Sequence, residues 1–222
     1  MKVLELFAGS RSVGNYCESQ GHEIFSSDVN DFEGIDYVTD ILNFETQKVP
    51  FIPQMIWASP PCTYFSVASI GVHWNEDHTP KTDNALKGVA YVKKTLEIIN
   101  YFLRLNPNLK YYIENPCGKL RKLKVIRGHN RFKLTYCSYG DNRMKPTDIW
   151  SNNIFDMFNP DGWNPKPPCF NNNNKCDHES APRGSKTGTQ GLKNNYERSK
   201  IPELLVKEIV DSTNKKFINF TE

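Results

Sequence analysis

Short apolar runs and helical patterns alternate along the first half of the chain. Five runs rich in branched and aromatic residues end at turn residues, as buried strands do. They lie at residues 2–7, 22–27, 37–39, 55–58 and 109–113. A helical period is clearest over residues 85–105, and a shorter helix is expected to end near Gln20. This alternation is typical of an open α/β sheet.

Glycine, acidic and thiol side chains follow four of these strands. Gly9 lies in the turn after the first strand, Asp28 ends the second, Asp40 follows the third and Cys62 follows the fourth. The carboxyl ends of parallel strands meet at one edge, where open α/β sheets bind their ligands. A glycine turn before a helix admits a nucleotide-like ligand, and a following acid can hold ribose hydroxyls. An ordinary strand-to-helix turn explains the glycine alone equally well.

Cys62 follows two prolines that stiffen the turn after the fourth strand. A thiol presented on such a turn is placed like a nucleophile, although most free cysteines are simply small buried hydrophobes. Glu114 occupies the matching place after the fifth strand, beside Asn115 and Pro116. Its position fits a catalytic partner for Cys62, and the alternative is an ordinary surface acid.

Taken in order, these motifs resemble those of the cytosine-C5 DNA methyltransferases. They are Glu5-Leu6-Phe7-Ala8-Gly9, Asp28, Asp40-Ile41, Ser59-Pro60-Pro61-Cys62 and Glu114-Asn115. The resemblance covers most of residues 1–150 and, more thinly, the C-terminal end. It implies a Rossmann-like fold dependent on S-adenosylmethionine, with a mixed, mostly parallel sheet, helices on both faces and a small irregular insert. The glycine turn departs from the family pattern, in which further glycines usually follow.

The resemblance implies a role for each motif. The thiolate of Cys62 adds to C6 of a flipped cytosine, so that C5 can attack the methyl group, while Glu114 grips N3 and the exocyclic amine. Around the cofactor, the resemblance implies that Phe7 and Gly9 approach it, with Asp28 at the ribose and Asp40 and Ile41 at the adenine. Ser59 and Pro60 are expected to line the passage from the cofactor to the thiol. For Phe7 and Ile41, plain core packing is the competing interpretation.

The segment 139–150 resembles the part of the family that carries its basic residues. When the segment is aligned on Tyr139-Gly140, Lys145 and Thr147 stand at the two positions where the family has arginines. Arg143 can take the place of one of these arginines only if the alignment is shifted locally. Arg143 and Lys145 are therefore the candidate cations that polarise the base or favour the thiolate. A lysine in place of arginine loses the bidentate geometry of a guanidinium.

The composition changes between residues 151 and 200, where prolines and four consecutive asparagines replace apolar periodicity. We expect a catalytic and cofactor-binding domain at 1–150, a small target-recognition-like insert at 151–200, and a C-terminal helix returning to the catalytic domain at 201–222. In the insert, Cys169, Cys176 and His178 offer three ligands for a structural zinc ion, with Cys137 or Cys117 as the fourth. Free thiols are the alternative.

A net charge of +3 is a mild indication of an anionic partner, and a basic stretch at 183–200 suits contacts with DNA phosphates. Residues 69–80 are a candidate lid over a flipped base. No apolar run is long enough to span a bilayer and no signal-peptide pattern is present. We therefore expect a cytoplasmic monomer, in a bacterial or phage-infected cell, that binds DNA and no membrane. If the protein belongs to a restriction-modification system, the matching restriction enzyme is encoded elsewhere.

Other functions remain open at this point. One is a catalytically silent DNA-binding relative, suggested by the altered arginine pattern and the small insert. Another is methylation of an exocyclic amine, which leaves Cys62 and Glu114 without a role. A third acts by the same chemistry on free nucleotides or RNA.

Overall fold

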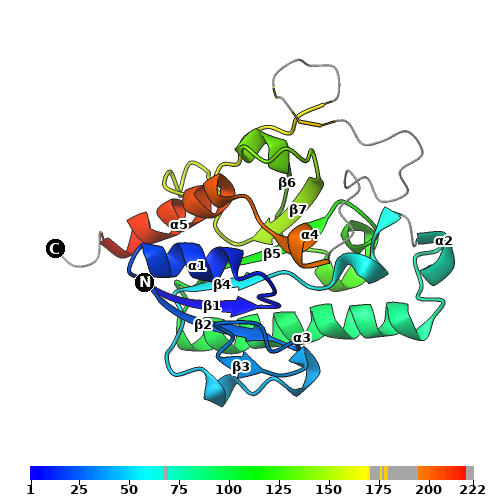
Figure 1. Cartoon of the computed structure of the whole chain (residues 1–222), viewed down its shortest axis with the longest axis horizontal. Coiled ribbons are helices and arrows are strands. Elements are labelled where there is room, and N and C mark those ends of the chain that lie inside the picture. Colours follow the sequence, from blue (N-terminus) through cyan, green and yellow to red (C-terminus); the bar gives the residue numbers. More distant parts are fainter. Residues whose placement is uncertain (68–69, 171–175, 177, 180–194, 219–222) are drawn as a thin grey trace.

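The computed structural model describes residues 1–67, 70–170, 176, 178–179 and 195–218. Within them, seven strands form one sheet in the order β3-β2-β1-β4-β5-β7-β6 (Figure 1). The strands are β1 (Lys2–Leu6), β2 (Glu23–Asp28), β3 (Tyr37–Val38), β4 (Met55–Ala58), β5 (Lys110–Pro116), β6 (Arg131–Thr135) and β7 (Pro146–Ser151). The first five are parallel, whereas β7 is antiparallel to both β5 and β6. The expected mixed, mostly parallel sheet is confirmed.

Helices cover both faces of the sheet, as expected (Figure 1). α1 (Ser12–Ser19) and α5 (Glu203–Ile218) pack against each other over one face, and the long α3 (Asp83–Leu105) covers the other. Each face therefore has its own apolar core. β1 and β4 are buried on both sides, which explains why their sequences are nearly continuous apolar runs rather than alternating ones.

The β6–β7 hairpin was not predicted from the sequence, and it lengthens β5. The strand expected at 109–113 runs on to Pro116, because Asn115 and Pro116 pair with Asp148 and Thr147 of β7. Thr135 pairs with Pro146 at the end of the hairpin. The loop between these two strands, residues 136–145, is therefore held beside the carboxyl end of β5, and it begins with the short helical turn η7 (Tyr136–Tyr139).

Several short helical elements lie in the connections outside the sheet. They are η1 (Ile41–Asn43), η2 (Thr46–Lys48), η3 (Cys62–Tyr64), α2 (Ile70–His73), η5 (Leu120–Lys122), η6 (Lys124–Ile126) and α4 (Asn195–Ser199). β1 lies between β2 and β4, so the chain progresses outward from it in opposite directions. Ligands of open α/β sheets bind at such a switch point.

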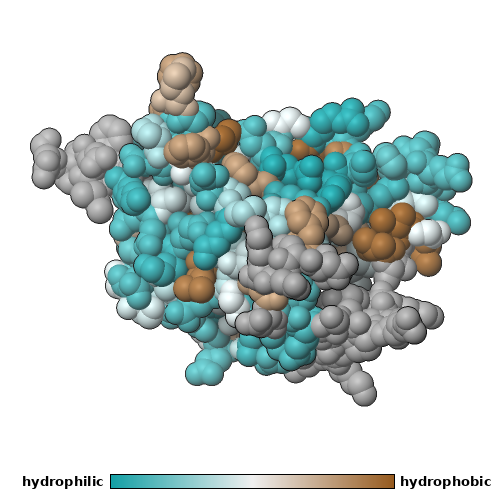
Figure 2. Space-filling model, turned by 90° about the horizontal axis from the view of Figure 1, so that it is seen from above, coloured by the Kyte–Doolittle hydropathy of each residue, from teal (hydrophilic) through white to brown (hydrophobic). Residues whose placement is uncertain are grey.

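The described part of the insert is irregular. Isolated bridges join Ile154 to Trp163 and Asp156 to Asn159, and Trp163 is buried against the β6–β7 side of the sheet. The division at residues 150 and 200 stays a prediction. Seen from above, the surface is mainly hydrophilic and its apolar groups stand apart from one another (Figure 2). No described helix has the length and hydrophobicity that crossing a membrane requires.

Candidate active site

A cavity of about 370 Å³ lies at the switch point, beyond the ends of β1, β2 and β4. Six of the seven residues expected around a cofactor line it, namely Phe7, Gly9, Asp28, Asp40, Ile41 and Ser59. The seventh, Pro60, is buried, and its neighbour Pro61 lines the cavity instead. Four strand-end segments that are far apart in the sequence thus converge on one hollow, together with residues of α3 and α4.

The two acids in the cavity are held by hydrogen bonds. Asp28 accepts from the backbone N–H of Gly9 at 3.0 Å through Oδ2 and from that of Asn30 at 2.9 Å through Oδ1. Asp40 caps η1 by accepting from the N–H of Leu42 and also accepts from the hydroxyl of Tyr91 at 3.2 Å. Both carboxylates are fixed in orientation and retain lone pairs for ligand hydroxyls or amines.

Phe7 and Ile41 serve the cavity and the core together, so the two interpretations of these residues are compatible. Ile41 is buried in the core under α3, and the ring of Phe7 lies 6.1 Å from that of Tyr91. Phe7 has a φ of 56°, which is unusual for a bulky side chain. Gly9 has a φ of 51°, and a Cβ there would lie 3.4 Å from the hydroxyl of Ser199. The turn after β1 is therefore tightly shaped against α4.

Arg11 and Ser12 stand where the usual family turn has further glycines, and Glu5 of β1 holds the start of the helix that follows. The fully buried Glu5 accepts from the N–H groups of Val13 and Gly14 at 3.2 and 3.1 Å, which caps the start of α1. Its carboxylate also accepts from the hydroxyl of Ser26 at 3.0 Å. Burial raises the pKa of Glu5 to about 7, against the hydrogen bond from Ser26 and the charge of Arg11, which lower it.

Two cavity residues from α4 were missed in the sequence. Tyr196 and Ser199 line the hollow, and the ring of Tyr196 lies 5.7 Å from that of Phe32 on the opposite wall. α4 is only five residues long and has no apolar period, so the sequence carried no signal for it. Only the fold brings residues 196 and 9 together.

Cys62 begins η3 and Glu114 lies near the carboxyl end of β5, and the two segments are joined by a hydrogen bond. The side-chain amide of Asn115, next to Glu114, donates to the carbonyl of Pro60 at 2.8 Å. Burial raises the pKa of the Cys62 thiol, the positive charge of Lys145 lowers it, and the negative charge of Glu114 raises it. The thiol, the carboxylate and the ammonium therefore share one electrostatic environment.

Glu114 is buried and has two partners from the loop after β6. The hydroxyl of Tyr136 donates to Glu114 Oε1 at 2.9 Å, and Lys145 Nζ lies 3.7 Å from the same oxygen. Lys145 Nζ also lies 4.4 Å from the centre of the Tyr136 ring and donates to the carbonyl of Arg198. Tyr136 was missed because strand β6, which delivers it, was not recognised in the sequence.

The two candidate cations have different surroundings. Lys145 lies beside Glu114, whereas the guanidinium of Arg143 pairs with Asp141. Arg143 Nε donates to Asp141 at 2.8 Å, and Nη1 and Nη2 donate to the carbonyls of Glu197 and Lys200 at the end of α4. Arg143 therefore fixes α4 through its carbonyls, and Lys145 is the cation beside the carboxylate.

The lid candidate at 69–80 begins outside the described residues and contains α2. The indole N–H of Trp74 donates to the carbonyl of Tyr64 at 2.8 Å, which attaches this segment to η3. His73 contacts Thr82, and His78 Nδ1 lies 2.9 Å from Lys119 Nζ. Of the basic stretch at 183–200, residues 183–194 also lie outside the described part.

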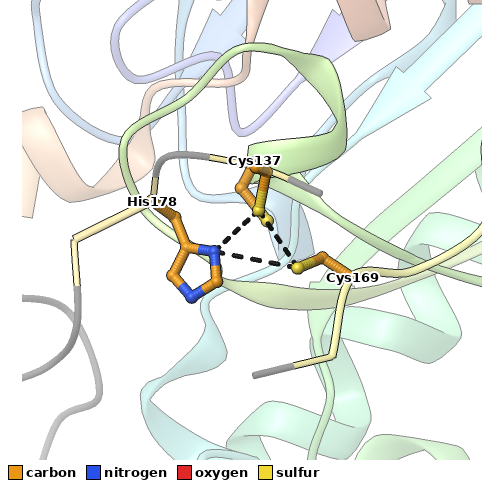
Figure 3. A group of neighbouring side chains, drawn as sticks. Cys137, Cys169 and His178 are labelled. Atoms are coloured by element: carbon orange, nitrogen blue, oxygen red, sulfur yellow. Dashed lines mark hydrogen bonds between the residues drawn. The ribbon is translucent and has the colours of Figure 1, made fainter. Parts of the chain in front are cut away.

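Four predicted metal ligands come together at η7, and Figure 3 labels three of them, Cys137, Cys169 and His178. The ligand atoms of Cys137, Cys169, Cys176 and His178 all lie within 4.8 Å of one another. Cys176 Sγ is 3.1 Å from Cys169 Sγ and 2.8 Å from His178 Nδ1, and this last contact lowers the pKa of Cys176 to about 7. Cys117, the alternative fourth ligand, does not belong to this group among the described residues.

No model of a known protein family matches the chain. A protein of Frog virus 3 (isolate Goorha) named "Probable DNA (cytosine-5)-methyltransferase" is 29% identical to it, over 95% of this chain and 99% of that protein. Among solved structures, methyltransferase EhMeth of Entamoeba histolytica superposes with a TM-score of 0.46 and 13% identity, over 68% of this chain and 52% of its own. Dnmt2 methyltransferase of S. pombe superposes with a TM-score of 0.42 and 15% identity, over 68% and 48%. Each of these superpositions spans about half of the solved chain. The fold assignment above rests on the strand order of the sheet and not on these superpositions.

Proposed function

We infer that the chain belongs to the cytosine-C5 DNA methyltransferase family and that it transfers a methyl group from S-adenosylmethionine to C5 of a cytosine in DNA. Its near full-length similarity to the Frog virus 3 protein supports this function. The observation that carries it is the environment shared by the Cys62 thiol and the Glu114 carboxylate, with the Lys145 ammonium acting on both.

The cavity at the switch point suits S-adenosylmethionine, which supplies an activated methyl group when bound. Asp28 is placed to accept hydrogen bonds from the ribose, as acids after the second strand of such sheets do. Ile41 offers an apolar wall and Asp40 a polar one for the adenine. Gly9 allows the close backbone approach that the rest of the cofactor needs.

Cys62 acts as the nucleophile toward the base. Its sulfur would form a bond to C6, and the electron pair displaced from the ring would let C5 bond to the methyl carbon while the bond from that carbon to the cofactor's sulfonium sulfur breaks, with S-adenosylhomocysteine as the leaving group. Loss of the C5 proton and departure of the Cys62 sulfur then restore the aromatic ring. Because burial raises the pKa of this thiol, the thiolate depends on the nearby charge of Lys145.

Glu114 holds the base edge that distinguishes cytosine. Tyr136 donates to Oε1, and within the described residues Oε2 accepts no hydrogen bond, so Oε2 is the oxygen available to N3 and the amine. With a proton on Oε2, Glu114 donates to N3, and passing this proton to N3 draws electrons from C6 as the thiolate adds. The cytosine reaches this pocket only after leaving the base stack.

Trapping with 5-fluorocytosine tests the proposed function. Fluorine at C5 prevents the last elimination, so DNA containing this base and S-adenosylmethionine should leave wild-type protein covalently attached to DNA after denaturation. Cys62→Ser should give no such complex, whereas Cys117→Ser, which removes a thiol outside the site, should give as much as wild type.

The outcomes of this trapping experiment separate the alternatives. Absence of a complex in wild type, with S-adenosylmethionine still bound, would favour a silent DNA-binding relative or another substrate. Methylation of cytosine by Cys62→Ser at the wild-type rate would contradict a covalent mechanism and favour amine chemistry.

We also propose that Cys137, Cys169, Cys176 and His178 bind a structural zinc ion. Ligands at about 2.0–2.3 Å from a tetrahedral zinc lie roughly 3.3–3.8 Å apart, which this group can reach with small side-chain movements. The ion would attach the segment around residue 169 to η7. That the protein acts on DNA is part of the proposed methyltransferase function. A cytoplasmic location and a monomeric state remain predictions.

Metal analysis tests the zinc site. Protein purified without chelator should contain about one zinc ion per chain, and Cys176→Ser should contain much less. Cys117→Ser is the matched control and should retain the wild-type zinc content. Equal zinc in all three proteins would place the ion elsewhere, and its absence from wild type would favour free thiols.

A further inference from the structure

The segment that follows Glu114 is strongly basic. Between Glu114 and Asp141 the chain has seven lysines and arginines and not one aspartate or glutamate. The cations are Lys119, Arg121, Lys122, Lys124, Arg127, Arg131 and Lys133. Since the whole chain carries a net charge of +3, the rest of the sequence is net negative, at −4. Positive charge is therefore concentrated in one short segment.

This segment lines a second cavity, of about 240 Å³, which shares no residue with the cofactor cavity. Its walls carry Arg121, Lys122, Arg127 and Arg131, together with His78 and His129, over an apolar side formed in part by Trp150. Four permanent cations thus face one hollow. Uncompensated positive charge at such density is unfavourable unless an anion binds there.

Asp148 fixes two of these cations in position but offsets only part of the positive charge. Its fully buried carboxylate lies 2.7 Å from Arg121 Nη2 and 2.8 Å from Arg131 Nη1. These two pairs fix the guanidinium groups, while one carboxylate offsets only one of the four positive charges. Lys119 adds to the field from the side, through its contact with His78. The cavity is preorganised for an anion.

The basic segment that lines the cavity is joined to the residue after η3 and, through Asp148, to β5 beside Glu114. The backbone N–H of Lys119 donates to the carbonyl of Phe65 at 2.8 Å, and Phe65 directly follows η3, which starts at Cys62. Gly118 makes this contact feasible, because a Cβ there would lie only 2.3 Å from the same carbonyl. In the β5–β7 register, Asp148 pairs with Asn115, next to Glu114.

We propose that this basic cavity binds a backbone phosphate of the DNA whose cytosine enters the active site. This inference rests on the proposed function, and it assigns a contact between the protein and a phosphate of the DNA substrate. Arginine guanidinium groups match the oxygens of a phosphodiester in pairs, and positioning of DNA is done mainly through its phosphates. The expected basic stretch at 183–200 lies mostly outside the described residues, so this cavity is an additional phosphate site. A free nucleotide carries the same anionic group and is separated from DNA by the test.

The test uses Lys122→Ala combined with Arg127→Ala. Both side chains are exposed and neither pairs with Asp148, so the fold should be retained. The control is Lys124→Ala combined with Lys93→Ala, which also removes two exposed charges, one of them from the same segment, but none from the cavity. Affinity for a duplex of about 30 base pairs is measured by fluorescence anisotropy at several salt concentrations.

We expect the cavity variant to bind this duplex at least about tenfold more weakly than the control at moderate salt. Its logarithmic salt slope should be smaller by about one, as loss of one phosphate contact requires. Equal affinity and slope in the two variants would overturn the proposal. The free nucleotide dCMP gives a second comparison. If the cavity variant loses binding to dCMP while its binding to the duplex is unchanged, the proposal is also overturned, in favour of a nucleotide site.

Covalent trapping separates this inference from the proposed function. If wild type is trapped on 5-fluorocytosine DNA and the cavity variant matches the control in binding, only the phosphate site is wrong. If wild type binds DNA through the cavity but is never trapped, the phosphate site stands and methyl transfer is wrong. Unchanged binding of S-adenosylmethionine by both variants verifies that they are folded.

Discussion

At the scale of single residues, Tyr136 is the least expected part of the site. It is fully buried, and its hydroxyl donates to the carboxylate that is proposed to hold the cytosine. Burial and the negative charge of Glu114 raise the pKa of Tyr136 well above its usual value, so the phenol stays protonated and remains a donor. Tyr136 is a positioning residue, since it acts on the base through Glu114.

Replacement of Tyr136 by phenylalanine tests this role. Removing a hydrogen bond to a charged group costs about 1.5–3 kcal/mol, so kcat should fall by roughly tenfold to a hundredfold. The KM for S-adenosylmethionine should change little, because Tyr136 does not line the cofactor cavity. Steady-state methylation kinetics check both values.

Tyr139→Phe is the control for Tyr136→Phe. Tyr139 lies in the same turn and is equally buried, but its hydroxyl donates to Glu208 of α5. Its removal should affect stability more than kcat. A similar loss of kcat in both variants would mean that the turn matters only structurally.

At the scale of elements, the attachment of α1 to β1 depends on a close contact. Glu5 of β1 caps the start of α1, and a Cβ on Gly14 would lie 2.7 Å from Glu5 Oε2 and 3.2 Å from Ser26 Oγ. Helix and strand therefore approach closely only because residue 14 lacks a side chain.

Gly14→Ala should lower the free energy of unfolding by about 1–3 kcal/mol, because the new methyl group meets a buried carboxylate that cannot move away. Urea denaturation measures the change. Gly71→Ala is the control, since a Cβ at that position in α2 meets nothing within 4 Å. A loss as large in Gly71→Ala as in Gly14→Ala would show that close approach is not the cause.

The elements themselves were only partly predictable. The parallel strands were found because each is an apolar run bounded by turn residues, and the observed ends of β1, β2 and β4 lie within about one residue of the predicted ones. β6 and β7 were missed because their sequences mix charged and apolar residues, as in Arg131–Thr135. Their strand character comes from pairing with β5 and with each other.

At the scale of the whole molecule, the buried acid Glu5 makes stability depend on pH. Burial raises its pKa from 4.5 to about 7, so the folded protein holds this proton more tightly than the unfolded chain. The resulting stabilisation is complete below pH 4.5 and is lost as the pH rises through 7. The shift corresponds to about 3 kcal/mol.

Glu5→Gln removes this titration. The free energy of unfolding of wild type, relative to that of the variant, should fall by about 3 kcal/mol between pH 4.5 and pH 8. Parallel urea titrations across this range measure the difference. Glu23→Gln, at an exposed position of β2, should show no comparable trend. A constant difference between wild type and Glu5→Gln would contradict a raised pKa for Glu5.

The sequence by itself determined the strand-end motifs, and with them the candidate catalytic pair and most of the residues that line the proposed cofactor cavity. Such residues follow their strands directly, so local patterning places them, and parallel pairing then brings Gly9, Asp28, Asp40 and Cys62 to one edge. It also identified the four candidate metal ligands, although only the structure favoured Cys137 over Cys117.

Tertiary structure alone decided the remaining contacts. Tyr136 reaches Glu114, Arg143 turns to α4, α4 covers the cofactor cavity, and the basic segment closes around a second cavity. Each of these depends on residues far apart in the chain, or on a strand that exists only through its partner. No local period or turn encodes such contacts, because they are formed by packing and sheet pairing rather than by neighbouring residues.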